Sequence, residues 1–385
     1  MEEWIKCPLG DILNFRRGHD LPKTNMIPGD IPVAGSNGII GFHNVSTPIS
    51  PCITIGRSGN VGTPYIYDKC WAHNTVLYID DYKGNDPKYL YYLLKTLPLS
   101  SFGGGSAVPT LNRNHIHPLE VVFCKDLGLQ KKIAGILSKI DDKIELNRQI
   151  NDNLEEQAQA LYKSWFVDFE PFCEGEFIES SLGSIPAGWK VGQLSDVCEI
   201  IGGGTPSKSH PEYYCNKGIA WLTPKDLSVS KSKFSGRGSE DITPEGYKNS
   251  SAKLMPRGTV LFSSRAPIGY ISIATNEICT NQGFKSAVPG IAGTGYLYYF
   301  LKANTDTIES KASGSTFKEA SGTLMKSLEA IIPADGILNQ FEAELAPILK
   351  KQENIASEIQ TLTTLRDGLL PKLMSGELKI NEIDC

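Results

Sequence analysis

Two long stretches of the chain carry apolar residues at spacings that alternate between four and three positions. From residue 129 to 165 there is no proline and only one glycine, so the pattern predicts a single long helix. Residues 341 to 373 repeat the pattern, and Pro347 and Pro371 are expected to start, kink or end that helix. Apolar residues at these spacings form the seam of a coiled coil.

The two seams share one register. From Leu137 onward, each position of the first seam has a counterpart 208 residues later. This match predicts that the two helices pack on each other, and polar seam residues would fix their register. The alternative is that each helix packs only on its own globular part. The seam positions are Ile133, Leu137, Ile140, Ile144, Asn147, Asn151, Leu154, Ala158, Leu161 and Trp165, and then Phe341, Leu345, Ile348, Gln352, Ile355, Ile359, Leu362, Arg366, Leu369 and Leu373.

The rest of the chain consists mainly of short apolar runs separated by Gly, Pro, Asn and Ser. Such runs at near-regular spacing predict a β-rich domain before each long helix. A tyrosine-rich segment follows each set of runs and predicts a helix packed on the strands, at residues 89–95 and 296–302. The apolar runs include residues 52–55, 65–67 and 76–79 in the first half and residues 259–262 and 271–273 in the second.

The order of these features is repeated along the chain. The Tyr-Leu-Tyr-Tyr segment at Tyr89 recurs at Tyr296, 207 residues later, whereas Trp4 recurs as Trp189 only 185 residues later. The second half therefore carries an insertion of about 22 residues, which we place within residues 208–248. The duplication predicts an internal pseudo-two-fold repeat that presents two similar but non-identical surfaces to one extended target.

Composition describes a globular chain without the charge of an isolated, tight nucleic-acid binder. Of the 385 residues, 40% are hydrophobic and 21% are charged. Residues 1–127 hold 11 basic and 11 acidic residues and residues 170–335 hold 16 and 17, so a partner subunit is expected to supply much of any contact to phosphates. No apolar stretch approaches the roughly 18 residues of a membrane span, and the start of the chain does not resemble a signal peptide, so we expect a cytoplasmic protein with no membrane partner. The nine cysteines form no CxxC pair and are expected to be reduced, with no metal site.

Glycine-rich loops follow matched strands in both halves, and each contains one arginine, Arg57 in residues 56–62 and Arg265 in residues 263–269. We interpret the two arginines as occupying the same place in the repeat. A guanidinium there could bind a guanine edge or hold a phosphate, and the alternative is a solvated surface turn. Nearby polar residues and loop cations complete the candidate nucleic-acid contacts: Arg16, Arg17, Lys23, Ser58, Asn60, Asn74 and Arg113 in the first half, and Lys208, Lys225, Asn281, Gln282 and Lys318 in the second.

The sequence contains no recognisable set of catalytic residues. The run from Gly202 to Gly204 lacks the Gly-Lys-Ser/Thr ending of a phosphate-binding loop, and there is no HExxH zinc motif or nucleophile elbow. His115 and His117 lie in a strand-like run but have no third ligand. We therefore interpret the chain as a recognition protein without catalysis of its own, with an enzyme of unrecognised site as a rival hypothesis.

The helix sequences resemble one family. Residues 130–134 (QKKIA), 144–147 (IELN) and 160–169 (ALYKSWFVDF), together with residues 369–378 (LLPKLMSGEL), closely resemble the DNA-specificity subunit of type I restriction-modification systems. The segments LGDI at residues 9–12 and GWKV at residues 188–191 are similar to the segments that open each recognition domain in that family. The resemblance covers essentially the whole chain.

The resemblance implies an α+β fold in which two β-rich target recognition domains are separated by two long antiparallel coiled-coil helices. The recognition domains are expected at residues 1–127 and 170–336, the helical spacers at residues 128–169 and 337–376, and a tail at residues 377–385. Each domain would read one half of a bipartite asymmetric site in double-stranded DNA, and the helices would set the gap. A helix of 37 residues is about 55 Å long, which corresponds to about 16 base pairs.

The resemblance also implies partners. Two modification (methyltransferase) subunits would dock on the helices and methylate adenine with S-adenosylmethionine, and restriction subunits would use ATP and Mg for translocation and cleavage. This chain would need no cofactor of its own. The resemblance assigns no base-reading residues, because recognition domains vary with their targets. The alternative is a coiled-coil scaffold or decoy subunit that does not read DNA.

Overall fold

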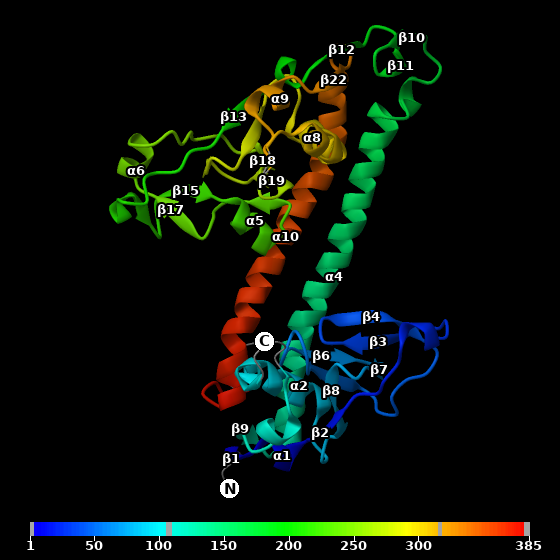
Figure 1. Cartoon of the computed structure of the whole chain (residues 1–385), viewed down its shortest axis with the longest axis vertical. Helices are drawn as coiled ribbons and strands as arrows, with labels where there is room; N and C mark the ends of the chain where they lie inside the picture. The colour runs from blue at the N-terminus through cyan, green and yellow to red at the C-terminus, as the bar shows by residue number, and fades with distance from the viewer. Residues whose placement is uncertain (1–3, 105–109, 315–317, 381–385) are drawn as a thin grey trace. The chain divides into compact units, whose positions relative to one another are not determined.

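The structure is a computed structural model that describes residues 4–104, 110–314 and 318–380 (Figure 1). The chain divides into two compact units, one formed by residues 1–146 and 360–385 and the other by residues 147–359. Each unit contains one β-rich domain and one part of each of two long helices, α4 (Leu127–Phe166) and α10 (Ile337–Ser375).

The first unit contains two sheets and one antiparallel strand pair. Its strands are β1 (Trp4–Pro8), β2 (Asn14–Arg17), β3 (Ile31–Gly35), β4 (Gly38–His43), β5 (Cys52–Gly56), β6 (Pro64–Tyr67), β7 (Trp71–Ala72), β8 (Val76–Asp81) and β9 (Glu120–Cys124). Its short helices are α1 (Leu9–Ile12), η1 (Lys23–Asn25), α2 (Pro87–Thr96), η2 (Leu99–Phe102) and α3 (Arg113–Ile116). The strand orders are β2-β8-β5-β6 and β4-β3-β7, and β1 pairs with β9. The apolar faces of the larger sheet, α2 and α4 share one core.

The second unit contains the same elements and several more. Its strands are β10 (Phe177–Ser180), β11 (Gly183–Pro186), β12 (Lys190–Gln193), β13 (Cys198–Gly202), β14 (Tyr214–Cys215), β15 (Ile219–Leu222), β16 (Phe234–Ser235), β17 (Glu240–Ile242), β18 (Val260–Ser264), β19 (Ile268–Ala274), β20 (Cys279–Thr280), β21 (Lys285–Pro289) and β22 (Glu329–Ile332). Its short helices are η3 (Glu170–Phe172), η4 (Leu194–Asp196), η5 (Pro211–Tyr213), α5 (Pro224–Ser230), α6 (Pro244–Lys248), α7 (Thr294–Ala303), α8 (Thr305–Lys311) and α9 (Gly322–Lys326). The sheets are ordered β13-β21-β18-β19-β16 and β14-β17-β15-β20.

The internal repeat predicted from the sequence is confirmed by the strand topology. The order β2-β8-β5-β6 of the first domain corresponds to β13-β21-β18-β19 of the second, and the parallel pair of β3 with β7 corresponds to the parallel pair of β15 with β20. The additional residues of the second domain include α5, β16 and α6, which lie between β15 and β18. The repeat therefore preserves the sheet that carries the candidate loops and varies the periphery.

Both predicted long helices are confirmed. α10 starts at Ile337 and is helical through Pro347 and Pro371, so neither proline starts or ends the helix, and the alternative of a kink or bend at these residues stays a prediction. The predicted seam is buried or half-buried along both helices. Asn147 is almost fully buried, and its side-chain amide nitrogen has no hydrogen-bond partner among the described residues.

In the first unit, one carboxylate on α4 joins the domain to both long helices. The hydroxyl of Tyr92 on α2 donates to Asp141 (2.8 Å), and Arg366 of α10 donates to the other oxygen of Asp141 (2.8 Å). Nearer the start of α2, the main-chain N–H of Asp86 donates to the buried side chain of Gln130 (2.9 Å). The contact of the domain with α4 and the pairing of α4 with α10 thus depend on the same carboxylate, that of Asp141.

In the second unit, the tyrosine at the matching place in the repeat meets a different carboxylate. Tyr299 on α7 donates to Glu155 of α4 (2.9 Å), and Gln352 of α10 donates to the same carboxylate (3.2 Å). Lys233 and Lys302 each lie 2.6 Å from Glu155, on different oxygens. The seam residue Gln352 therefore takes part in a polar network and is not an isolated polar group in the seam.

The charges of this network stabilise one another. Burial alone raises the pKa of Glu155, but the ammonium groups of Lys233 and Lys302 outweigh it and hold the pKa at about 2. Burial lowers the pKa of Lys233 to about 8, against the opposing effect of Glu155. Both partners are therefore ionised at neutral pH, and removing one leaves a buried charge without its counter-ion.

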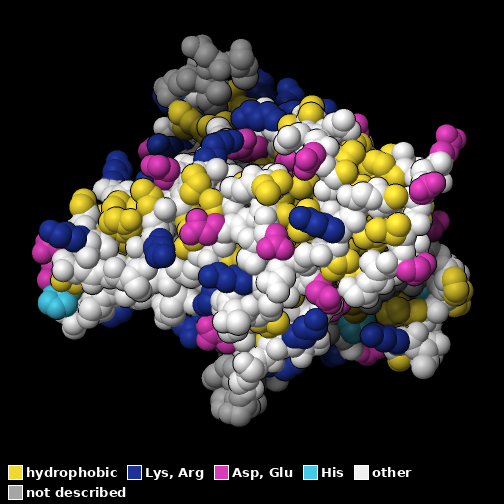
Figure 2. All heavy atoms as spheres, turned by 90° about the horizontal axis from the view of Figure 1, so that it is seen from above, with side chains coloured by type: hydrophobic (Ala, Val, Ile, Leu, Met, Phe, Trp, Pro, Cys, Tyr) yellow, Lys and Arg dark blue, Asp and Glu magenta, His cyan; other side chains and the backbone are white. Residues whose placement is uncertain are grey.

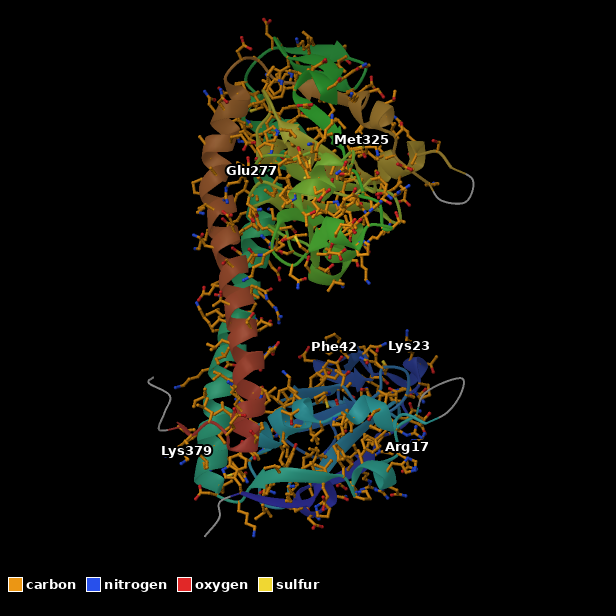
Figure 3. All side chains as sticks on the ribbon, turned by 90° about the vertical axis from the view of Figure 1, so that its left-hand side faces the viewer. Arg17, Lys23, Phe42, Glu277, Met325 and Lys379 are labelled. Carbon is orange, nitrogen blue, oxygen red and sulfur yellow. The ribbon has the colours of Figure 1, made fainter. Side chains whose placement is uncertain are left out.

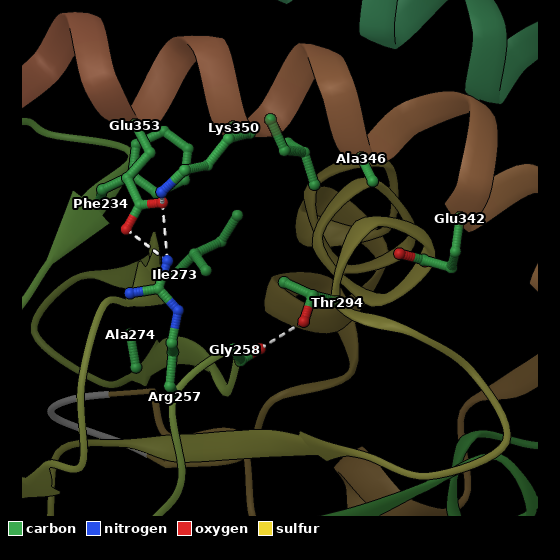
Figure 4. Close-up of a pocket in the computed structure, with 11 residues that line it drawn as sticks. Phe234, Arg257, Gly258, Ile273, Ala274, Thr294, Glu342, Ala346, Lys350 and Glu353 are labelled. Carbon is green, nitrogen blue, oxygen red and sulfur yellow. Dashed lines mark hydrogen bonds and ion pairs between the residues drawn. The ribbon is translucent and has the colours of Figure 1, made fainter.

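A second set of contacts fixes α10 to the same domain. One guanidinium nitrogen of Arg257 lies 2.6 Å from both carboxylate oxygens of Glu353 (Figure 4). Glu342 accepts the N–H groups of Gly295 (3.1 Å) and Tyr296 (2.7 Å), so a side chain of α10 caps the first turn of α7. These contacts border a pocket of about 330 Å³ between α10 and the domain.

We predict that Glu155→Gln destabilises the second unit by about 3 kcal/mol at pH 7, because Lys233 loses its counter-ion. The pKa of Glu155 is lower in the folded chain than its ordinary value of 4.5, so its stabilisation is complete above that value and is lost as the pH falls through about 2. The stability difference between wild type and Glu155→Gln should therefore shrink as the pH falls below 4.5. Chemical unfolding followed by fluorescence of the tryptophans in this unit measures it. The exposed neighbour variant Glu156→Gln is the control, and a difference that does not change with pH would contradict the prediction.

Candidate nucleic-acid interface

Four of the arginines chosen from the sequence line one groove of the first domain. Arg16 and Arg17 stand at the end of β2, Arg57 follows β5, and Arg113 opens α3. Strand pairing brings these segments together, because β8 lies between β2 and β5. The groove has a volume of about 390 Å³, and its other lining residues are Leu77, Thr110, Leu111 and Asn112, none of which is acidic.

Main-chain contacts hold two of these arginines at the groove. The guanidinium of Arg113 donates to the carbonyl of Phe15 (3.2 Å), and that of Arg57 lies 3.5 Å from the carbonyl of Asn74. These acceptors are neutral, so the positive charge of each guanidinium is not cancelled by its partner. Arg17 has Asp20 at 4.0 Å, and both side chains are well exposed. Four guanidinium groups around one groove create a positive potential that favours an anionic ligand.

The other candidates of the first domain are not part of the groove lining. Lys23 lies on η1, and Figure 3 shows it at a separate place from Arg17. Asn60 accepts a hydrogen bond from Thr63 within the loop (3.1 Å), and Asn74 donates to Asp20. Ser58 pairs through its main chain with Thr110. The two asparagines thus have local partners that explain their positions.

The two loop arginines do not occupy the same place in the repeat, which corrects the interpretation made from the sequence. The main chain of Arg57 accepts from Leu111, whereas the matching acceptor in the second domain is Ser264, which accepts from Ala320. Ser58 pairs with Thr110, and Arg265 makes the matching bridge with Glu319. Arg265 therefore corresponds to Ser58. The sequences suggested otherwise because the two loops differ in length, and successive residues of an extended segment point to opposite sides.

Arg265 belongs to a mixed charge cluster. Its guanidinium lies 3.5 Å from one oxygen of Glu319, and the ammonium of Lys285 lies 3.4 Å from the other. Neither Glu319 nor Lys285 was selected from the sequence. Lys285 opens β21, and Glu319 comes from a segment far along the chain that bridges to Arg265, so neither had a local sequence signal.

The remaining candidates of the second domain have varied surroundings. Lys208 lies 3.3 Å from Glu240 and 4.3 Å above the ring of Tyr214. Asn281 accepts the N–H of Gly283 (2.9 Å), Gln282 accepts from Thr205, and Lys318 reaches the carbonyl of Glu309 (3.4 Å). Lys225 lies exposed on α5.

His115 and His117 were expected to lie in a strand, but neither does. His115 lies in α3 and His117 follows it, and the ring nitrogen Nε2 of His117 accepts the N–H of Phe15 (3.1 Å). Burial and the nearby Arg113 lower the pKa of His117, so it serves as a neutral acceptor in the domain. Among the described residues, no group of three or more His, Cys, Asp or Glu could hold a metal ion. No helix in the described part of the chain is long and apolar enough to cross a membrane.

Figure 2 shows one face of the molecule, on which basic and acidic side chains are interspersed with hydrophobic ones. This agrees with the near-neutral composition of both domains. The arginine groove is thus a local gathering of positive charge in a domain of near-neutral composition.

The family described as the type I restriction modification DNA specificity domain matches residues 1–156 and 186–370. The type I restriction enzyme MjaIX specificity subunit of Methanocaldococcus jannaschii is 38% identical over 197 residues, which cover 48% of this chain and 45% of that protein. The chain thus spans less than half the length of this relative. The EcoR124I/EcoR124II specificity subunit of Escherichia coli is 27% identical over 93% of this chain and 88% of its own length.

A solved structure supports the fold. The type I restriction-modification system S subunit from M. genitalium superposes with a TM-score of 0.62 and 16% sequence identity, over 96% of each chain. The arrangement of two β-rich domains with two long helices is therefore one that an experimentally determined structure also adopts.

Proposed function

The chain belongs to the type I restriction-modification DNA specificity family, and from this premise we propose that it is the sequence-reading subunit of a type I restriction-modification complex. Each β-rich domain reads one half of a bipartite asymmetric site in double-stranded DNA. The two long helices set the gap between the halves and dock two modification subunits.

The observation that carries this proposal is the internal repeat. Two domains of one topology are each fixed to both long helices through a tyrosine at the matching place, Tyr92 or Tyr299, which donates to a carboxylate of α4. A DNA-reading protein built in this way presents two binding surfaces held by the same pair of helices. A scaffold, in contrast, needs no pair of folded domains with different loops. The arginine groove gives the first domain a surface suited to DNA.

The groove chemistry suits contact with both bases and phosphates. Arginine can donate two hydrogen bonds to the O6 and N7 atoms of guanine in the major groove, and such a pair contributes about 1–3 kcal/mol of discrimination. The other arginines of the groove would hold phosphates, which position the domain without reading sequence. We assign base reading to Arg57, because its loop is the most glycine-rich segment at the groove and allows close approach.

Docking of modification subunits on the helices is supported by apolar side chains that remain exposed there. Leu146 of α4 and Leu365 of α10 are 51% and 48% exposed. Large apolar residues on a helix surface that has already buried its seam are suited to a further protein contact. The modification subunits would bring S-adenosylmethionine for adenine methylation, and restriction subunits would bring ATP and Mg.

The proposal is tested by sequence selection with the assembled complex. The chain is purified together with its modification subunits, and bound duplexes are recovered from a random DNA pool. The proposal expects two constant blocks separated by a gap of fixed length. An assembled complex that enriches no motif would indicate a scaffold or decoy, and a single continuous block would reject bipartite reading.

We predict that Arg57→Ala weakens sequence preference in one half-site and leaves the other unchanged. Loss of a guanine contact should cost about 1–3 kcal/mol of discrimination at the affected position. The same selection measures this for the variant and for Lys69→Ala, which removes an exposed cation elsewhere in the first domain. Equal weakening of both half-sites would mean that Arg57 holds a phosphate and does not read a base.

We also predict that a matched deletion in both helices shortens the gap. Removing residues 147–153 from α4 and their repeat counterparts 355–361 from α10 shortens each helix by one heptad, about 10 Å or about 3 base pairs. Both half-site sequences should stay the same, since neither domain is altered. Selection with the assembled variant gives the new gap, and a gap of unchanged length would refute the role of the helices as spacers.

A further inference from the structure

The two domains differ in chemistry at the place where the first has its arginine groove. In the first domain, Arg17 of β2 lies opposite Leu77 of β8. In the second domain, the matching pair is Gly202 of β13 opposite Lys285 of β21. The positive charge has therefore moved from one strand of the pair to the other.

Two further positions change in the same region. Arg113 is the first residue of α3, and the first residue of the corresponding α9 is Gly322. Thr110 bridges to the loop after β5, and its counterpart in the second domain is Glu319. Arginines are thus replaced by glycines at two positions, and a neutral residue is replaced by a carboxylate.

The side chain of Lys285 lies beside both glycines. A Cβ atom at Gly202 would lie 3.8 Å from Cδ of Lys285, and a Cβ atom at Gly322 would lie 3.9 Å from its Cε. The aliphatic part of Lys285 therefore occupies space beside both glycines, and its side chain is only 17% exposed. This places its ammonium group beside Glu319.

Glu319 stands between two cations. Arg265 faces one carboxylate oxygen at 3.5 Å and Lys285 faces the other at 3.4 Å. Both distances are longer than those of the ion pairs that anchor this domain to the long helices. Lys233 and Glu155 lie 2.6 Å apart, as do Arg257 and Glu353. The carboxylate is also 38% exposed. Its oxygens can therefore accept hydrogen bonds from a ligand.

From this geometry we propose that Glu319 is a specificity-determining residue of the second domain, resting on the proposed function of the chain as a DNA reader. Its carboxylate accepts a hydrogen bond from the exocyclic amino group of an adenine or cytosine in the major groove. Lys285 and Arg265 give the cluster a net positive charge, which offsets the repulsion between a carboxylate and the DNA phosphates. Their N–H groups donate to neighbouring acceptors of the same base pair, which are adenine N7 and thymine O4 beside an adenine amino group, or guanine O6 beside a cytosine amino group.

The proposal explains why one frame reads two different half-sites. The first domain presents four donors and no carboxylate at this place, which favours guanine and phosphate. The second domain presents the acceptor Glu319 between the donors Lys285 and Arg265. This order favours a base pair whose major-groove edge offers an amino group between or beside acceptor atoms. A thymine or guanine in place of the amino-bearing base would leave Glu319 facing an acceptor.

The test uses sequence selection by the complex assembled from the full chain and its modification subunits. With Glu319→Gln, we expect preference at one position of the second half-site to change by about tenfold, because an amide can donate as well as accept. The gap and the first half-site should be unchanged. Glu277→Gln, at an exposed position of the same domain (Figure 3), should leave the whole motif unchanged.

The outcomes separate this proposal from the function on which it rests. A split motif that is identical for wild type and Glu319→Gln overturns the role of Glu319 and leaves bipartite reading intact. A wild-type complex without a split motif overturns the proposed function itself. If Glu319→Gln does not assemble, Glu319→Asp keeps the charge but withdraws the carboxylate by one methylene, and it should weaken preference at one position of the second half-site; an unchanged motif would again overturn the proposal.

Discussion

The structure depends on carboxylates of α4 that each hold a domain and the partner helix at once. Asp141 receives Tyr92 from the first domain and Arg366 from α10, and Glu155 receives Tyr299 and Gln352 in the same manner. Leaving a half-buried charge of this kind unpaired costs free energy. Positions of the domain on the helix that break these contacts are therefore disfavoured. The proposed reading of DNA requires a fixed orientation of each domain on the helices, and these contacts supply that constraint within each unit.

Because each domain is held in place on the long helices, the proposed DNA specificity can change through a few exposed side chains. The larger sheet of each domain has the same strand order, and the segments that carry Arg57 and Arg265 follow corresponding strands. Around them, Arg17 and Arg113 of the first domain correspond to glycines in the second, and Leu77 and Thr110 correspond to Lys285 and Glu319, without a change in sheet topology. The core residues that build the sheets are separate from the side chains that would meet DNA, which allows the latter to vary at little cost in stability.

Much of this organisation could be predicted from the sequence. The alternating spacings predicted both long helices and their buried seam, and the matched order of motifs predicted the repeat. The grouping of Arg16, Arg57 and Arg113 needed the strand order, because these residues are far apart in the chain. The role of Glu155 was not predicted, since a glutamate beside a heptad seam is usually solvated, and its burial follows from Lys233 of the inserted segment. The displacement of Arg265 relative to Arg57 reflects unequal loop lengths that only main-chain pairing reveals.

The central claim is that two domains on one frame read two halves of a single site. Methylome sequencing of DNA from cells that express this chain with its modification subunits tests the claim most directly. The account predicts a split motif with methylated adenine in both halves and a gap of constant length. A continuous methylated motif, or no methylation by a complex shown to assemble, would contradict it.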